Sequence, residues 1–357
     1  MRIGIIGLPQ SGKRTLFHLL TGNGVRPAGL DPQKALPGVA DIRDARFERL
    51  VRLYAPQSRA PAKIDLDLFP DLDARILADT KLLQDIARAD ALCLVVRAFE
   101  NAAVYHVHGT VDPVRDIDEV GAELLLNDLA FVEKRLDRVE RETRHTHQAG
   151  ADREKALLAR MKAHLEAGLP LRTLSLSVEE FRRLAVYPIA TLKQLVVALN
   201  TAGATAGESD ADPRLAARAG THGLHLMHLA AGAEAEIQEL DTDAERAEFM
   251  AAAGIREPAL NLLSRLCMAA LGLISFFTVG KDEVKQWLVR RGSTAPEAAG
   301  VIHSDIERGF IRAEVMHYDD LTALGSEQAV KRAGKHATMG RDYVVQDGDV
   351  INFLFNV

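Results

Sequence analysis

Apolar residues in the first half of the chain recur in short runs of strand length, and stretches with helical spacing lie between them. The strand-like runs occupy residues 3–6, 62–69, 90–98, 194–200 and 224–231. Helical spacing fits residues 15–22, 45–55 and 78–89. Alternation of strands and helices predicts an α/β fold with a mainly parallel sheet, which binds ligands at the carboxyl ends of its strands.

The pattern changes between the third and fourth of these strand runs. Apolar residues there alternate at spacings of four and three, first at Leu125, Leu129, Val132, Leu136 and Val139, then at Leu158, Met161 and Leu165. A polar break at residues 148–152 separates the two groups. This predicts an antiparallel helical hairpin over residues 118–183 that projects from the sheet domain as an inserted arm. Two amphipathic helices packed on the sheet are the alternative.

A third pattern begins near Gly272. Residues 273–280, 284–292, 311–320 and 342–355 read as strands, and residues 293–310 read as a helix with an early proline. We therefore expect a nucleotide-binding sheet domain over residues 1–117 and 184–271, and a small mixed α+β domain over residues 272–357. The lysines and arginines of that last domain form either a solvated face or a contact for RNA backbone.

Composition narrows the class of protein. The chain has 357 residues and a formal net charge of −6, so no overall basic field attracts nucleic acid. Cys93 and Cys267 both lie in apolar runs, which predicts buried thiols rather than a disulfide or a metal site. The first apolar run is too short for a signal peptide, and no long uncharged apolar segment is present. We expect a cytoplasmic protein that has no membrane partner.

The stretch GLPQSGKRT, from Gly7 to Thr15, carries the candidate chemistry. Gly7, Gly12 and Lys13 fit the phosphate-loop pattern G-x-x-x-x-G-K, and the stretch lies between a predicted strand and a predicted helix. Backbone N–H groups of such a loop wrap phosphates, the helix N-terminus adds partial positive charge, and the lysine reaches the β- and γ-phosphates. The sequence therefore predicts a nucleotide site here.

Five stretches together resemble one known family. They are GLPQSGK, DALCLVVRAFEN, VDPVRDIDEVGAELLLNDLAFVEKRL, the segment from TVGKDEVKQWLV to ERGFIRAEV, and DYVVQDGDVINFLFNV. They resemble the YchF/Obg-like ATPase family over nearly the whole chain. The resemblance implies a helical arm and a C-terminal TGS domain, which is a β-grasp module. It also implies a P-loop protein of the translation-factor class that prefers ATP over GTP and associates with ribosomes.

Several residues match the family's nucleotide site. Gly7, Pro9, Gly12 and Lys13 match its loop, and Gln10 and Ser11 occupy variable positions. Asn200 matches the asparagine whose amide reads the adenine edge. Gly203 stands where the family has glutamate, and Gly232 stands where it has lysine.

The departures from the family gather around the metal. Arg14 replaces the serine that ligates Mg²⁺, and Thr15 is about 100° further round the helix. No serine or threonine lies between Thr21 and Ser58 to supply the second hydroxyl. Asp67 is the tentative acidic metal ligand and Asp71 the second candidate, but Pro70 then replaces the switch glycine and has no N–H for a γ-phosphate.

These losses leave magnesium binding doubtful and predict weak hydrolysis, because phosphoryl transfer relies on the metal. Arg14 either approaches the phosphates in place of the metal or turns to solvent or an acidic neighbour.

Three functions remain open. The first is a YchF-like protein that binds ATP, with GTP as the alternative nucleotide, and contacts a ribosome or other RNA-containing partner. The second is an active magnesium-dependent ATPase, and the third is an interaction scaffold without nucleotide. His303 and Asp305 read as cap or surface residues rather than as catalytic groups.

Overall fold

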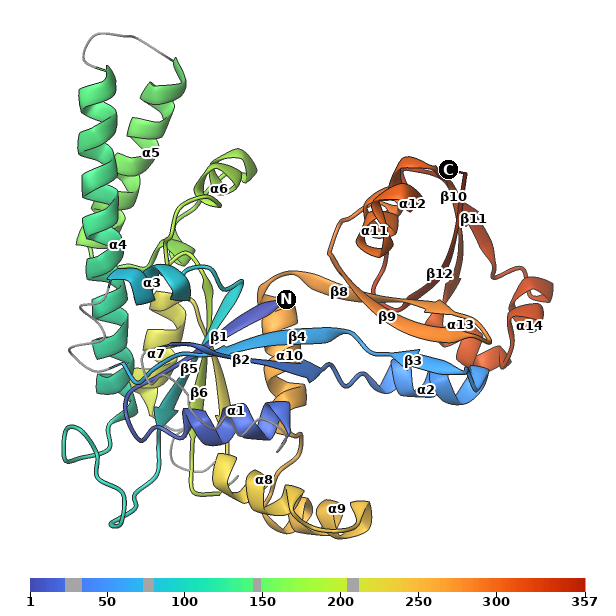
Figure 1. Cartoon of the computed structure of the whole chain (residues 1–357), viewed down its shortest axis with the longest axis horizontal. Coiled ribbons are helices and arrows are strands. Elements are labelled where there is room, and N and C mark those ends of the chain that lie inside the picture. The colour runs from blue at the N-terminus through green and yellow to red at the C-terminus, as the bar shows by residue number, and fades with distance from the viewer. Residues whose placement is uncertain (23–33, 73–79, 144–148, 204–211, 357) are drawn as a thin grey trace. The chain divides into compact units, whose positions relative to one another are not determined.

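The computed structural model of the chain describes residues 1–22, 34–72, 80–143, 149–203 and 212–356 (Figure 1). These residues form two compact units. The first comprises Met1–Ala40 and Asp65–Leu263, and the second comprises Asp41–Ile64 and Ser264–Val357.

The first unit is built on a six-stranded sheet in the order β2-β4-β1-β5-β6-β7. Its strands are β1 (Arg2–Ile6), β2 (Leu36–Asp41), β4 (Lys63–Leu68), β5 (Ala91–Arg97), β6 (Gln194–Asn200) and β7 (Leu224–Leu229). The pairs β4–β1, β1–β5, β5–β6 and β6–β7 are all parallel. Every residue of β5 is buried, as its continuous apolar run predicts for a central parallel strand. The α/β fold with a mainly parallel sheet is confirmed.

The first unit also contains helices. They are α1 (Lys13–Thr21), α3 (Thr80–Ile86), α4 (Pro113–Thr143), α5 (Ala149–Glu166), α6 (Val178–Leu184), α7 (Pro213–His222), α8 (Ala231–Gln238), α9 (Asp243–Ala252) and the start of α10 (Ala259–Ala270), with a 3₁₀ turn at Leu171–Thr173. The residues of α10 from Ser264 on belong to the second unit. The helices α6 and α9 both begin with a capping box, at Ser177 and Thr242, which satisfies backbone N–H groups that have no partner inside the helix.

The helices α4 and α5 lie side by side and form the predicted hairpin (Figure 1). The seam residues Val132, Val139, Leu158, Met161 and Leu165 are buried in one cluster, as their spacing predicts. The helix α4 starts at Pro113, earlier than the predicted arm boundary, and its first turns pack in the sheet core through residues such as Val114 and Ile117. One continuous helix therefore belongs both to the sheet layer and to the arm.

Two details of the arm differ from expectation or lie outside the structure described. Most of the predicted turn at residues 148–152 is helical, since α5 already begins at Ala149. Residues 144–148, between the helices, are outside the described residues.

At the base of the arm, the buried carboxylate of Asp128 accepts the N–H groups of Ala190 and Thr191, at 3.1 and 2.7 Å. Burial raises the pKa of Asp128 to about 6.

The second unit is a mixed sheet in the order β11-β10-β12-β8-β9-β3. Its strands are β3 (Ser58–Ala60), β8 (Leu273–Val279), β9 (Glu283–Arg290), β10 (Phe310–His317), β11 (Ala337–Met339) and β12 (Asp349–Phe355). The pair β8–β9 is antiparallel, and β12 runs parallel to β8. Helical segments lie between the β8–β9 pair and β12 in the chain, which agrees with the predicted β-grasp arrangement.

Both faces of the second sheet are covered. On β8 the neighbouring residues Phe276 and Phe277 are fully buried in different clusters, because successive side chains of a strand point to opposite faces. Contacts with α11 (Ala295–Ile302) and α12 (Ser304–Arg308) cover one face. Contacts with α2 (Ala45–Tyr54) and α13 (Tyr318–Leu324) cover the other, and α14 (Glu327–Arg332) follows.

The predicted elements of the C-terminal region need three corrections. The helix predicted at residues 293–310 is two helices, because His303 adopts extended backbone and caps α12 by accepting the N–H of Asp305. His303 is therefore a cap, as predicted. Residues 318–320, expected in a strand, begin α13. Of the strand predicted at 342–355, only Asp349–Phe355 forms β12.

The division into units differs from the predicted domains at two segments. Residues Asp41–Ile64 and residues 264–271, expected in the nucleotide-binding domain, fold with the C-terminal unit. The first of these segments is the longer. In this segment Phe47 and Leu50 are fully buried in the cluster around Phe277, and Arg46 pairs with Asp347 at 2.9 Å. The strand β3 extends the sheet by pairing with β9. The reason is the amphipathic pattern of α2, which needs an apolar surface to cover but does not specify which one.

Cys93 and Cys267 are both buried and neither is in a disulfide, as predicted, and burial raises the pKa of Cys93 to about 12. Among the described residues, no helix combines the length and the apolar character needed to cross a bilayer.

The placement of α2 in the second unit can be tested with Phe47→Ala. Removing this fully buried ring should lower the free energy of unfolding of the second unit by about 3–5 kcal/mol. Denaturant unfolding followed by the fluorescence of Trp287, the single tryptophan of the chain, reports on this unit. Phe355→Ala is the matched control because that ring is 45% exposed. Equal effects of the two substitutions would contradict the assignment of α2 to this unit.

Candidate functional site

The candidate phosphate loop joins the end of β1 to the start of α1, as the sequence predicts. Lys13 is the first residue of α1, and Gly12 before it has a left-handed backbone with φ +92°. A Cβ atom at Gly12 would lie 2.2 Å from Asn200 Nδ2, so a larger residue does not fit. Gln10 also has a positive φ of 61°, which is uncommon for a residue with a side chain. The loop thus turns tightly before a helix N-terminus, where backbone N–H groups can face an anion.

Lys13 is held inside this turn. Its ammonium group is buried and donates to the carbonyl oxygen of Phe69 and to Asp71 Oδ1, both at 2.9 Å. Burial lowers the pKa of Lys13 to about 8, although Asp71 opposes that effect. The positive charge is therefore fixed at the carboxyl end of the sheet, where a phosphate would meet it.

Asn200, at the end of β6, fastens the loop to the neighbouring strand. Its Nδ2 donates to the carbonyl oxygen of Ser11 at 3.0 Å, and its Oδ1 accepts the N–H of Ala231 at 3.1 Å. These contacts join the phosphate loop to the start of α8. Recognition of an adenine edge by Asn200 stays a prediction, and these hydrogen bonds give the residue a structural role as well.

The remaining loop residues differ in exposure. Ser11 is buried, Pro9 and Thr15 are partly buried, and Gln10 and Arg14 are exposed. Arg14 makes no hydrogen bond or ion pair with another residue in the described part of the chain. Its charge contributes to the lowered pKa of Lys13, so the two cations lie near each other. Arg14 is thus exposed beside the loop and pairs with no acidic residue of the described ranges.

The two acidic candidates have different surroundings. Asp67 lies within β4, opposite Gly4 of β1, and its carboxylate pairs with Arg2 at 3.5 Å. Asp71 lies beyond the end of β4 and reaches Lys13. The structure therefore brings the second candidate, Asp71, to the loop and directs Asp67 towards the N-terminal residues. Residues 73–79, which follow these two candidates in the chain, lie outside the described residues.

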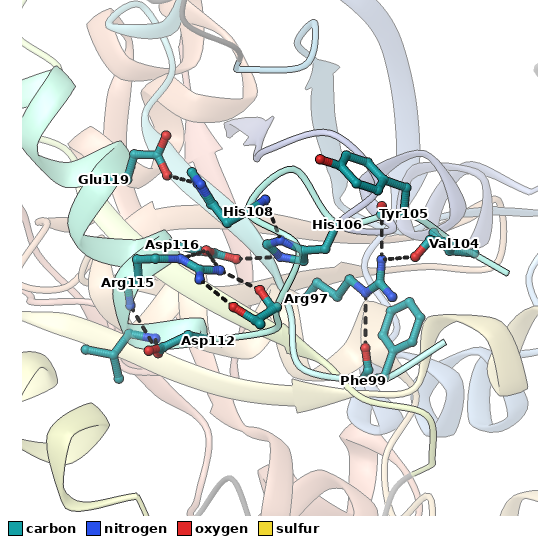
Figure 2. A network of polar contacts seen from close by, with 12 residues as sticks. Arg97, Phe99, Val104, Tyr105, His106, His108, Asp112, Arg115, Asp116 and Glu119 are labelled. Carbon is teal, nitrogen blue, oxygen red and sulfur yellow. Dashed lines mark hydrogen bonds and ion pairs between the residues drawn. The ribbon is translucent and has the colours of Figure 1, made fainter. Parts of the chain in front are cut away.

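Arg97, which sequence reasoning missed, organises the segment that follows β5 (Figure 2). This buried side chain donates to the carbonyl oxygens of Phe99 and Val104, both at 3.0 Å, and stacks over the Phe99 ring. It also donates to the carbonyl oxygens of Asn101 and Tyr105, both at 3.3 Å. One side chain thus shapes a loop with little regular structure of its own. The available signal was an arginine closing an otherwise apolar strand.

A second buried pair links this segment to α4 (Figure 2). The Nδ1 atom of His106 accepts the N–H of His108 at 3.2 Å, so the ring proton belongs on Nε2, which lies 3.1 Å from Asp116 Oδ2. Arg115 donates to the other oxygen of Asp116. A cavity of about 10 Å³ separates this pair from Ser11, whose buried Oγ has no partner among the described residues.

His108, Asp116 and Glu119 place potential ligand atoms within 4.8 Å of one another. Their contacts are those of an ion-pair network, however. The Nε2 atom of His108 is 2.6 Å from Glu119 Oε2, and Arg115 and His106 already engage Asp116. The guanidinium of Arg115 beside Asp116 opposes a cation there.

The lowered pKa of Lys13 predicts how phosphate binding depends on pH. The ammonium form binds an anion, and the nucleotide-free protein loses that proton as pH rises through about 8, whereas an exposed lysine keeps it to about 10.5. We expect nucleotide affinity to be level near pH 7 and to fall by about tenfold per pH unit above 8. Calorimetric titration from about pH 7 to about pH 9.5 measures this. Affinity that stays level to pH 9.5 would contradict a buried Lys13 as the phosphate contact.

Comparison with known proteins agrees with this geometry over the full chain. Residues 273–356 match the family YchF-GTPase_C, described as "Protein of unknown function (DUF933)". The chain is 35% identical to the "Ribosome-binding ATPase YchF" of Bacillus subtilis, over 99% of both chains. It is 36% identical to "Obg-like ATPase 1" of Oryza sativa subsp. japonica, over 100% of this chain and 92% of that protein.

A solved structure gives the same result. The Schizosaccharomyces pombe YchF GTPase superposes with a TM-score of 0.83 and 30% identity, covering 99% of this chain and 97% of that chain. Since the identity to curated relatives extends over the whole chain, and the loop, sheet and C-terminal unit are all in place, the chain belongs to the YchF family.

Proposed function

We propose that this chain is a nucleotide-binding protein of the YchF type that prefers ATP to GTP, hydrolyses it weakly and associates with a ribosome or other RNA-containing partner in the cytoplasm. The observation that carries the proposal is the buried Lys13 ammonium at the mouth of a glycine-shaped loop, before the N-terminus of α1. A buried cation is costly unless an anion lies beside it, and the carboxylate of Asp71 is that anion among the described residues. A phosphate group is a further anion that the loop N–H groups and the helix N-terminus would favour.

The residues present fit the phosphates of a nucleotide. Backbone N–H groups between Gly7 and Thr15 would surround them, and Lys13 would balance their charge. The hydrogen bonds of Asn200 hold the loop in shape, and Gly12 leaves room for that side chain. These residues would bind and orient the phosphates.

The residues do not fit Mg²⁺ as the family holds it. Arg14 stands at the hydroxyl position, no serine or threonine occurs between Thr21 and Ser58, and Asp67 pairs with Arg2. No step of hydrolysis is therefore derived through a metal. The exposed guanidinium of Arg14 supplies positive charge near the loop without one, which favours binding that is independent of the metal.

The relatives' names and the charges of the C-terminal unit support the partner. Several relatives are ribosome-binding ATPases by name. In the second unit, exposed cations occur at Lys281, Arg290, Arg291, Arg308, Arg312, Lys331, Arg332, Lys335 and Arg341. Exposed lysines and arginines neutralise phosphates of RNA and make binding sensitive to salt.

The nucleotide part of the proposal is tested by calorimetric titration of ATP, ADP and GTP, with Mg²⁺ and then with EDTA. We expect adenine nucleotides to bind more tightly than GTP, and binding to survive EDTA. Lys13→Ala should weaken binding by about tenfold or more, because it removes the buried counter-charge of the phosphates. Lys63→Ala, an exposed lysine of β4, is the control and should leave affinity unchanged. Binding lost in EDTA would favour the magnesium-dependent ATPase, and no binding at all would favour the scaffold.

The partner is tested by co-sedimentation with ribosomes across a salt series. We expect the protein in the pellet at low salt and its release as salt rises, since phosphate contacts weaken with ionic strength. Charge reversal at Arg290 and Arg291 should weaken pelleting, whereas Arg88→Glu in the first unit should not. Protein that stays in the supernatant at low salt would contradict the partner assignment.

A further inference from the structure

The segment after β4 places a carboxylate of this chain against the phosphate-binding lysine. Asp71 Oδ1 lies 2.9 Å from Lys13 Nζ, and the carbonyl oxygen of Phe69 lies at the same distance from that atom. Two of the three ammonium N–H groups therefore already have acceptors from residues 69–71. The side chain of Asp71 is 40% exposed, so its carboxylate is at the edge of the site rather than deep within the protein.

The backbone that carries Asp71 is fixed on both sides. The N–H of Phe69 donates to the carbonyl oxygen of Ile5, and the N–H of Leu72 donates to that of Gly7, both at 3.0 Å. Leu72 is fully buried in the core of the sheet, and Pro70 restricts the backbone between them. The backbone around Asp71 is thus anchored to β1 and to the phosphate loop. A main-chain movement that carried Asp71 away from Lys13 would break these hydrogen bonds.

The Asp71 carboxylate disfavours the γ-phosphate of a nucleotide more than the phosphates closer to the nucleoside. A phosphate-loop lysine contacts the β- and γ-phosphates, while loop N–H groups surround the phosphates closer to the nucleoside. A γ-phosphate beside Lys13 would meet the Asp71 carboxylate, and like charges brought together cost several kcal/mol. Pro70 offers no N–H to the γ-phosphate, and the hydroxyls that would hold a bridging Mg²⁺ are absent from Arg14 and from residues 22–57. A diphosphate avoids the clash and keeps the loop contacts.

We propose that Asp71 makes this site select nucleoside diphosphates over triphosphates. The inference rests on the proposed nucleotide binding and adds the phosphate number that the site accepts. The Asp71 carboxylate acts as a resident anion that takes the place of the γ-phosphate beside Lys13.

Titration of ADP and ATP into the full chain in EDTA tests this inference, with wild type, Asp71→Asn and Asp67→Asn compared. Asp71→Asn keeps the shape and an acceptor for Lys13 but removes the charge. Asp67→Asn is the matched control, since Asp67 lies within β4 and contacts Arg2 instead. The titrations belong at about pH 6.5, because Asp71 raises the pKa of Lys13 and its loss would otherwise discharge the lysine.

We expect wild type and Asp67→Asn to bind ADP about tenfold or more tightly than ATP, and Asp71→Asn to reduce that preference by about tenfold or more. Equal binding of ADP and ATP by wild type, or an unchanged preference in Asp71→Asn, would overturn the inference and leave nucleotide binding intact. No binding of either nucleotide by any of the three proteins would overturn the proposed function and the inference together.

A parallel series with Mg²⁺ decides between two roles of the carboxylate. If Asp71 discriminates by charge, wild type in Mg²⁺ should bind ATP no more tightly than Asp71→Asn binds ATP in Mg²⁺. If Mg²⁺ makes wild type bind ATP more tightly than ADP and Asp71→Asn loses that gain, Asp71 is a metal ligand and the inference is wrong.

Discussion

The buried ammonium of Lys13 is the constraint on which the site depends. It lies at the carboxyl edge of a parallel sheet and before a helix N-terminus, where several partial positive charges already converge. Burial there is tolerated because Phe69 and Asp71 accept its hydrogen bonds. Those two acceptors belong to the segment after β4, so the position of the lysine and the position of that segment are decided together. Binding of a ligand to Lys13 would therefore also alter the contacts of the segment that follows β4.

The surroundings of the loop are fastened by single side chains rather than by regular structure. Asn200 joins the loop to β6 and to α8, and Arg97 shapes the segment after β5 through backbone carbonyl groups. His106 and Asp116 join that segment to the first turn of α4, which continues into the arm as one helix of 31 residues and about 46 Å. The phosphate loop and the start of α4 are thus each held by a few buried polar contacts. Losing one partner of such a contact is costly, because it leaves a buried polar group without a hydrogen bond.

The chain between β2 and β4 adds a second connection of a different kind. Its residues Asp41–Ile64 complete the C-terminal unit, where α2 covers one face of the sheet and β3 extends the edge beside β9. The same covalent segment starts at β2 and ends at β4, and β4 pairs with β1, which leads into the phosphate loop. The second unit is accordingly not a module formed by the C-terminal residues alone.

Much of this protein could be read from its sequence, because the deciding interactions are local or periodic. The strands β4 to β7, the helices α4 and α5, the phosphate loop and the loss of the hydroxyl at Arg14 all follow from apolar spacing and from a short motif. The sequence could not decide where α2 packs, because an amphipathic helix specifies the need for an apolar surface and not which surface supplies it. Nor could it choose between Asp67 and Asp71, since the choice depends on where β4 ends relative to Lys13. Arg97, His106 and Asp116 meet only through tertiary packing, and polar contacts between distant residues leave no periodic trace in a single chain.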